Sequence, residues 1–121
     1  MDKHLLIALF HIILVVPLFL YVGFQRAATP EWIYNLMFGL GLVILAYHGV
    51  KSVIRLVSGS MGAWINLIHV IVVAPLLIYI GYIGKKTPRP AYEILLMVGF
   101  AALGYHLKSL IEASQTFIND S

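Results

Sequence analysis

Residues 11–23 read HIILVVPLFLYVG, and residues 69–81 read HVIVVAPLLIYIG. The second stretch lies 58 positions after the first, and both carry histidine, proline, tyrosine and glycine at the same four places. The match extends outward, because residues 4–48 and residues 62–106 are identical at 16 of 45 aligned positions. Since the matched positions include rare polar residues, shared hydrophobicity does not explain them, and the pattern predicts an internal duplication.

The composition excludes a soluble globular domain. Of the 121 residues, 61% are hydrophobic and 11% are charged, whereas soluble domains are about 45–50% apolar and about 25% charged. A domain of this size buries only about two thirds of the surface that its unfolded chain exposes. It could not hide this much apolar surface from water, so a soluble enzyme and a disordered chain are both excluded, and lipid is the expected solvent.

The chain holds four apolar stretches of the length that a membrane requires, because a helix needs about 20 residues to cross a hydrocarbon core of about 30 Å. The last stretch includes Lys108, which lies near its end and can snorkel to the surface. Thr29-Pro30 and Thr87-Pro88 break the chain between helices. The four predicted spans are residues 5–24, 33–50, 63–83 and 92–111.

Each copy of the duplicated segment holds two of these spans, so both copies enter the membrane from the same side. The prediction is an all-α, four-helix transmembrane bundle built from two tandem parallel helical-hairpin repeats. It forms a single membrane domain over residues 1–121, with repeat one at residues 4–57 and repeat two at residues 62–114. Both termini lie on one side. Four basic residues flank each side, so the positive-inside rule does not set the orientation.

Four histidines lie at one predicted depth inside these apolar spans. Each is six or seven residues, about 10 Å of helix, from the membrane edge that bears the termini. An ionisable residue at such a depth usually faces the bundle interior and has a partner, and it marks a candidate functional site. These histidines are His11, His48, His69 and His106, and the tyrosines next to two of them, Tyr47 and Tyr105, join the candidate belt.

Other residues share the faces of the histidines. A spacing of seven keeps residues on one stripe of a helix, which groups Tyr34, Gly41 and His48, and likewise Tyr92, Gly99 and His106. The two glycines predict close helix contacts. On the other two helices the predicted inward face carries His11, Leu14, Leu18 and Tyr21, and its copy carries His69, Val72, Leu76 and Tyr79. Pro17 and Pro75 lie in mid-helix and predict kinks.

Four functions of the histidines remain open at this stage. Opposed histidine pairs could ligate haem, with glycine making room for the ring, and the sequence does not say whether a pair forms within one repeat or across both. Four converging imidazoles could instead bind zinc or copper, with Tyr47 and Tyr105 as supporting hydrogen-bond acceptors. They could conduct protons or other ions, or they could serve helix packing alone, at about 0.6 kcal/mol per hydrogen bond.

Other classes of function lack support in the sequence. No nucleophile triad, phosphate loop or paired carboxylates occur, so no catalytic residues and no enzymatic activity are predicted. No basic face for nucleic acid is present, and cysteine is absent. The expected partners are the lipid bilayer, a second copy of the chain or other membrane proteins. The cofactor is left open between haem, a transition metal and none.

The stretch HVIVVAPLLIYIG at residues 69–81, followed by Thr87-Pro88 and by Tyr105-His106, resembles small uncharacterised multi-pass membrane proteins of large DNA viruses of algae and protists. The resemblance covers one repeat, and through the duplication nearly the whole chain. It implies a viral membrane or virion membrane as the setting, and it implies no catalytic or binding residues. A structural component of such a membrane is therefore the alternative to a ligand-binding or proton-conducting protein.

Overall fold

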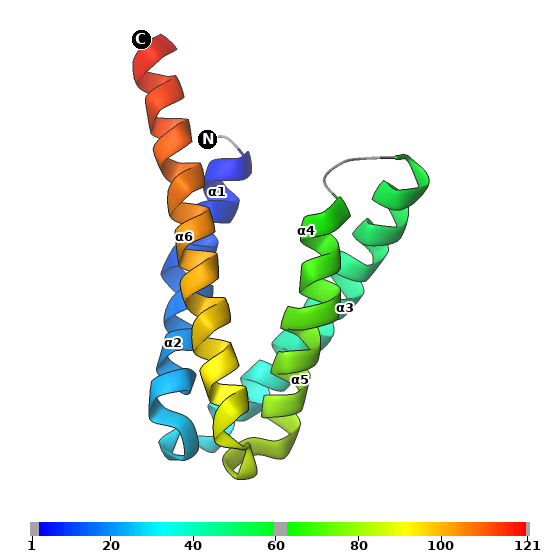
Figure 1. The fold of residues 1–121 in the computed structure, drawn as a ribbon, viewed down its shortest axis with the longest axis vertical. Coiled ribbons are helices and arrows are strands. Elements are labelled where there is room, and N and C mark those ends of the chain that lie inside the picture. The colour runs from blue at the N-terminus through cyan, green and yellow to red at the C-terminus, as the bar shows by residue number, and fades with distance from the viewer. Residues whose placement is uncertain (1–2, 60–62, 121) are drawn as a thin grey trace. The chain divides into compact units, whose positions relative to one another are not determined.

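The computed structural model describes residues 3–59 and 63–120, and this part of the chain is helical almost throughout, with no strand (Figure 1). The predicted all-α class is therefore confirmed. Residues 60–62, which include the predicted start of repeat two, lie outside the described residues. The α-helices are α1 (Lys3–Phe10), α2 (Val16–Gln25), α3 (Glu31–Val57), α4 (Ala63–Ile68), α5 (Ala74–Ile83) and α6 (Arg89–Asp120).

Four helical stretches among the described residues are long and apolar enough to cross a membrane. The first includes α1 and α2, the second is α3, the third includes α5, and the fourth belongs to α6. The fourth is longer than the sequence predicted, because no proline or glycine follows Ile111 to end the helix. The stretches are Leu5–Ala28, Glu31–Val57, Asn66–Lys86 and Arg89–Thr116.

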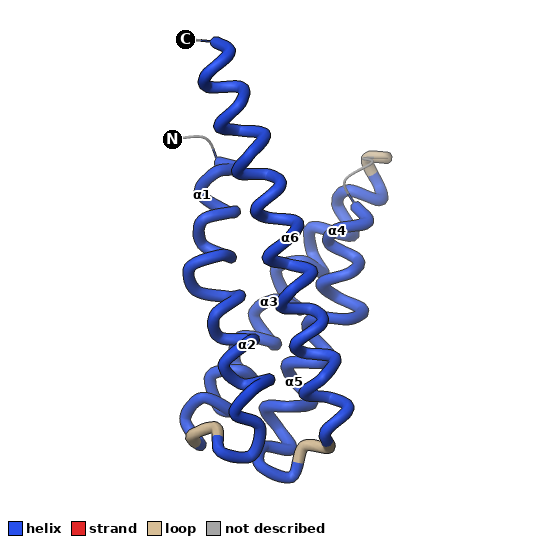
Figure 2. Tube along the Cα trace, turned by 60° about the vertical axis from the view of Figure 1, so that its left-hand side comes forward, coloured by secondary structure: helices blue, strands red, loops and turns tan. Residues whose placement is uncertain are grey.

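The chain divides into two compact units, each made of two helical stretches that lie side by side. Unit 1 joins α1 and α2 to α6 from Tyr92 onward, and unit 2 covers Arg26–Ala91, in which α3 packs against α4 and α5. The tube in Figure 2 allows each pair of helices to be followed along the chain. Each unit therefore takes one helical stretch from each predicted repeat.

Glycines bring the two helices of each unit into close contact. In unit 2, a Cβ at Gly81 would lie 2.5 Å from the backbone nitrogen of Phe38, and one at Gly41 would lie 2.8 Å from Cγ1 of Ile78. In unit 1 the corresponding contacts join Gly23 to Leu96 and Gly99 to Leu20. The contacts of the two units correspond under the 58-residue repeat. The Gly23–Leu96 contact is equivalent to Gly81–Phe38, and the Gly99–Leu20 contact is equivalent to Gly41–Ile78. The helices of both units thus run antiparallel in the same register.

A π-helical segment precedes each mid-helix proline: residues His11–Val15 lie before Pro17, and residues His69–Val73 lie before Pro75. The amide of Val16 donates to the carbonyl oxygen of His11, and the amide of Ala74 donates to that of His69. Proline has no N–H, and in an α-helix its ring clashes with the carbonyl four residues earlier. The wider π turn is the local response at the positions where the sequence predicted kinks, and it inserts one extra residue into each helix.

This extra residue moves the contact face of both helices by one position. The sequence predicted that Leu14, Leu18 and Tyr21 share the inward face with His11, but Tyr21 is 40% exposed. The buried residues that follow His11 on this helix include Val15, Phe19 and Val22 instead. The copy in unit 2 shows the same correction, because Tyr79 is 45% exposed while the buried residues that follow His69 include Val73, Leu77 and Ile80. A regular period of 3.6 residues does not anticipate a π turn.

The two turns before α3 and α6 each begin with a residue at positive φ. Arg26 has φ of 51° and Gly84, which lies 58 residues later, has φ of 66°. Each of these residues opens a 3-10 turn that a backbone hydrogen bond closes three residues later. Thr29 N–H donates to Arg26 O, and Thr87 N–H donates to Gly84 O, both at 3.0 Å. Glycine adopts positive φ without a steric cost, whereas arginine does not.

Side chains tie the two turns of unit 2 together. The Tyr34 hydroxyl donates to the carbonyl oxygen of Arg26 at 2.6 Å. The ammonium group of Lys85 donates to the carbonyl oxygens of Ala27 and Thr29 at 3.1 and 3.2 Å. Lys85 thus supplies a donor to two carbonyl groups at the helix end, and Tyr34 gives the carbonyl of Arg26 a second donor besides the amide of Thr29. Tyr34, which the sequence grouped with His48, therefore serves the turn at the opposite end of α3.

The Gly81 contact predicts a sharp difference between two glycine substitutions. Gly81→Ala should lower the free energy of unfolding by about 1–3 kcal/mol, because the new methyl group meets backbone atoms of Phe38 that cannot rotate away. Gly49→Ala is the matched control, since a Cβ there meets nothing within 4 Å and alanine favours the helix by about 0.5–1 kcal/mol. Thermal unfolding of the purified protein in detergent measures both changes, and equal effects would contradict the close contact.

Arg26 offers a second test of the backbone. Arg26→Gly should be more stable than Arg26→Ala by about 1 kcal/mol, because both variants lose the side chain but only glycine relieves the left-handed conformation. Gly84→Ala should lose stability by a similar amount, since it places a Cβ at the equivalent position. Chemical or thermal unfolding of the three variants checks the sign, and an Arg26→Ala variant as stable as Arg26→Gly would contradict it.

Candidate functional site

The four predicted histidines meet in two stacked pairs, one in each unit. In unit 1 the rings of His11 and His106 have centroids 4.2 Å apart and planes inclined by 20°. In unit 2 the rings of His48 and His69 have centroids 4.2 Å apart and planes inclined by 17°. Each pair joins one helix of each predicted repeat, which answers the question that the sequence left open. All four side chains are half-buried.

Hydrogen bonds at Nδ1 fix the proton position in one ring of each pair. Nδ1 of His11 lies 2.7 Å from the carbonyl oxygen of Ile7, and Nδ1 of His48 lies 2.7 Å from Oδ1 of Asn66. Both acceptors are carbonyl oxygens that cannot donate, so the neutral ring carries its proton on Nδ1 and its lone pair on Nε2. A ring held in this tautomer presents Nε2 as the nitrogen that accepts a proton.

The neighbouring tyrosines flank the pairs edge-on. The rings of Tyr47 and His48 are perpendicular with centroids 5.0 Å apart, and those of Tyr105 and His106 are perpendicular at 5.2 Å. Perpendicular rings are a favourable aromatic arrangement. Both tyrosines are exposed, and the ammonium of Lys51 lies 5.3 Å from the centroid of the Tyr47 ring. The two tyrosines thus cover the outer edge of each pair.

The remaining predicted residues lie apart from the histidine pairs. Tyr34 and Tyr92 are buried, and the hydroxyl of Tyr34 is used at the turn described above. Tyr21 and Tyr79 lie on exposed faces, and so do Pro17 and Pro75. Gly41 and Gly99 are buried in the helix contacts of their own units. The structure therefore reduces the predicted belt of histidine and tyrosine to the two histidine pairs and their flanking tyrosines.

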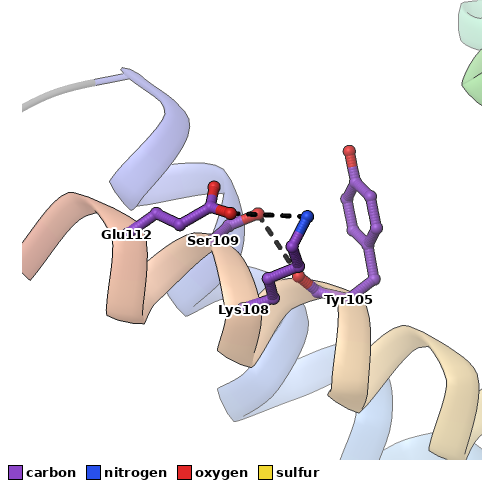
Figure 3. A network of polar contacts seen from close by, with 4 residues as sticks. All are labelled: Tyr105, Lys108, Ser109 and Glu112. Atoms are coloured by element: carbon purple, nitrogen blue, oxygen red, sulfur yellow. Dashed lines mark hydrogen bonds and ion pairs between the residues drawn. The ribbon is translucent and has the colours of Figure 1, made fainter.

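A polar network lies one helical turn beyond the histidine of α6 (Figure 3). The ammonium of Lys108 lies 3.4 Å from a carboxylate oxygen of Glu112, and the hydroxyl of Ser109 donates to the carbonyl oxygen of Tyr105 at 3.2 Å. Both charged side chains are exposed, and an exposed ion pair four residues apart on a helix contributes about 0.3–0.5 kcal/mol. This network lies on the exposed surface of α6 and adds little to the stability of the helix.

Each unit by itself brings two of the four predicted histidines together. In the part of the chain that the structure describes, no group of three or more His, Cys, Asp or Glu side chains could hold a metal ion. Structural zinc sites almost always use four ligands, and catalytic sites use three protein ligands. A pair of imidazoles alone falls short of both.

The pairs also leave no room for haem. Bis-histidine ligation needs the two imidazoles on opposite faces of the macrocycle. The two rings must then be separated by at least two van der Waals contacts, about 7 Å. The observed centroids are only 4.2 Å apart in both units. Neither pair, as it is formed, can enclose a tetrapyrrole.

Sequence reasoning missed Asn66, the partner of His48. Asn66 is 3% exposed and lies on α4, three residues before His69. It falls outside the set of matched residues, because the position 58 residues earlier is Ala8. An asparagine in an otherwise apolar helix was the available signal, since buried amides are normally hydrogen-bonded.

Comparisons with protein-family profiles, with curated proteins and with solved structures give no match.

The bond between Asn66 and His48 predicts a measurable coupling. In a double-mutant cycle of Asn66→Ala and His48→Phe, the interaction free energy should be about 0.6 kcal/mol and at most about 1.7 kcal/mol. Unfolding of the four proteins in detergent gives the value. A cycle of Asn66→Ala with Trp32→Leu is the control, because Trp32 is exposed and lies at the start of α3, far from His48. The effects of these two substitutions on stability should be additive. Additivity in both cycles would contradict the hydrogen bond.

Proposed function

We propose that this chain is a multi-pass integral membrane protein without enzymatic activity, whose paired histidines bind protons within the bilayer. The four long apolar helices support the membrane location. The observation that carries the proton-binding role is the face-to-face stacking of two histidine pairs. This assigns the protein to the proton-conducting or pH-responsive class, in preference to haem or metal carriers.

In this proposal the four helices form one bundle made of two tandem parallel repeats, at residues 4–57 and 62–114, with both termini on one side. The common register of the helix contacts supports the duplication, because a shift of 58 residues relates them. Large apolar side chains cover the outer surface of the helices and support lipid as the partner, among them Phe24, Val43, Val57, Ile71 and Met97. No nucleic-acid partner is proposed.

A stacked histidine pair can hold one proton far more easily than two. Two unit charges about 4 Å apart repel by about 4 kcal/mol at an effective dielectric constant of 20, and the ring centroids in each unit are 4.2 Å apart. A first proton on Nε2 of one ring meets a neutral neighbour, whereas a second proton meets an imidazolium. Each pair therefore behaves as one proton-binding element.

Proton binding at such a pair acts on the contact between two helices. His11 and His106 come from the two helices of unit 1, and His48 and His69 come from the two helices of unit 2. Repulsion between two protonated rings pushes these helices apart. A second proton on a pair therefore loosens the contact between its two helices, and acidification favours that state.

The proposal predicts that stability falls as the pH falls. The unfolded chain binds a proton at every histidine, whereas each folded pair resists the second proton, so the unfolded state binds more protons and stability rises with pH. The melting temperature should therefore fall between about pH 8 and pH 5. Thermal unfolding in detergent across this range measures it.

Phenylalanine pairs provide the matched controls, because they retain ring stacking and cannot titrate. His11→Phe with His106→Phe should remove the contribution of unit 1, and His48→Phe with His69→Phe should remove that of unit 2. A pH dependence that survives all four substitutions would contradict the proposal. Proton flux into proteoliposomes loaded with a pH-sensitive dye then separates conduction from a purely conformational response.

The structural alternative has support of its own in the close glycine contacts at Gly81 and Gly41. In that case the histidines serve only to fasten helices, and the protein is a structural component of a membrane, with a viral membrane as the setting that the resemblance implies. Stability that stays flat between about pH 8 and pH 5, together with a loss of stability in the phenylalanine pairs, would favour this alternative.

A further inference from the structure

The two histidine pairs differ in the polar groups around them. In unit 2, Asn66 and Ser52 are 3% and 4% exposed. Oδ1 of Asn66 accepts the bond from His48, but Nδ2 of Asn66 and Oγ of Ser52 have no hydrogen-bond partner among the described residues. Buried polar atoms nearly always have a partner, and a bound ion or water is a common explanation of an exception.

These two orphaned groups belong to the same helix contact as the histidine pair. Ser52 lies four residues after His48, and therefore on the same face of α3 one turn further on. Asn66 lies on α4 three residues before His69 and contacts His48 directly. The contact between α3 and α4 thus carries the pair and, next to it, two buried groups that can donate hydrogen bonds.

Unit 1 lacks this arrangement. The position equivalent to Asn66 is Ala8, which is buried and apolar. The serine that corresponds to Ser52 is Ser109, allowing for the one-residue gap between the repeats, and its hydroxyl donates to the carbonyl oxygen of Tyr105 (Figure 3). The feature is therefore specific to unit 2 and does not follow from the duplication.

The charges of unit 2 favour an anion at this place. Glu31 is the only acidic residue among residues 26–91, and it lies 17 residues before His48, about 25 Å along α3. Within unit 2 a proton on the half-buried pair thus has no carboxylate nearby, and a positive charge inside an apolar span is costly unless it is paired. The other ionisable groups near the pair are Tyr47, Lys51 and Arg55 on α3, while α4 and the following π segment carry His69 alone.

We propose that the contact between α3 and α4 takes up a small monovalent anion of the chloride class together with the proton that the His48–His69 pair binds. Nδ2 of Asn66 and Oγ of Ser52 donate hydrogen bonds to the anion, and the protonated pair supplies the positive charge. A water molecule would satisfy the two donors but not the charge. This inference rests on the proposed proton binding and names the ion that accompanies the proton.

The test uses the full chain in detergent, at about pH 5.5 and about pH 8, while chloride replaces gluconate at constant ionic strength. Chloride should raise the melting temperature at the lower pH and have little effect at the higher pH. By reciprocal coupling, the apparent chloride affinity should rise by up to about tenfold for each unit of acidification, the limit in which the anion binds only with the proton.

Asn66→Asp is the decisive variant, because it keeps the shape of the side chain and supplies the negative charge from the chain itself. It should lose the chloride effect, because the carboxylate beside His48 then balances the proton on the pair. Asn35→Asp is the matched control, since Asn35 is exposed near the start of α3, and it should keep the chloride effect of the wild type. Ser52→Ala removes one donor and should weaken chloride binding severalfold without abolishing the pH dependence.

Each outcome is decisive. A chloride effect of equal size in the wild type and Asn66→Asp overturns the anion site. Absence of a chloride effect in a wild type that keeps its pH dependence also overturns it, and assigns the two donors to water, while the proposed proton binding stands. A wild type without pH dependence overturns the proposed function and the anion site with it.

Discussion

Proline has no amide hydrogen, and the geometry of both units depends on how the helices accommodate this at Pro17 and Pro75. In each case the helix widens into a π turn that begins at a histidine, whose carbonyl oxygen accepts a bond from the amide five residues later. The extra residue rotates everything that follows, so the next residues against the partner helix are Val15 and Phe19 instead of Leu14 and Leu18. π turns of this kind occur frequently at functional sites.

The glycine contacts then decide how close the helices come. At Gly81 the helix meets the backbone of Phe38, and at Gly41 it meets Ile78. Such close approach at one end allows two imidazoles to stack further along the same pair of helices, as His48 and His69 do. Because each unit draws one helical stretch from each predicted repeat, neither repeat can form a histidine pair alone.

Differences between the two units show where the copies have diverged. Arg26 occupies a left-handed position that holds Gly84 in the other copy, which places strain in one turn only. Asn66 replaces an alanine and brings a hydrogen bond to His48 together with an orphaned donor. Next to its histidine pair, unit 1 therefore has the methyl group of Ala8 where unit 2 has a buried amide. A division of roles between two otherwise equivalent pairs has its physical basis in these substitutions.

The sequence by itself determined the class of fold and the candidate residues. Apolar runs of about 20 residues and the repeated Thr-Pro pairs located four helices and two of their turns, because hydrophobicity and backbone propensity act locally. The spacing of seven placed Gly41 and Gly99 on faces that are buried. Periodicity failed on the opposing helices, since the choice between a kink and a π turn at proline depends on the packing around it.

Only the tertiary structure decided which histidines meet. Pairing within a repeat and pairing across the repeats bury the same apolar residues, so the hydrophobic pattern does not distinguish them. The stacking of His11 on His106 and of His48 on His69 is a property of the folded chain alone. The role of Asn66 was hidden for a related reason, because a hydrogen bond between residues 18 positions apart follows from helix packing and not from any local motif.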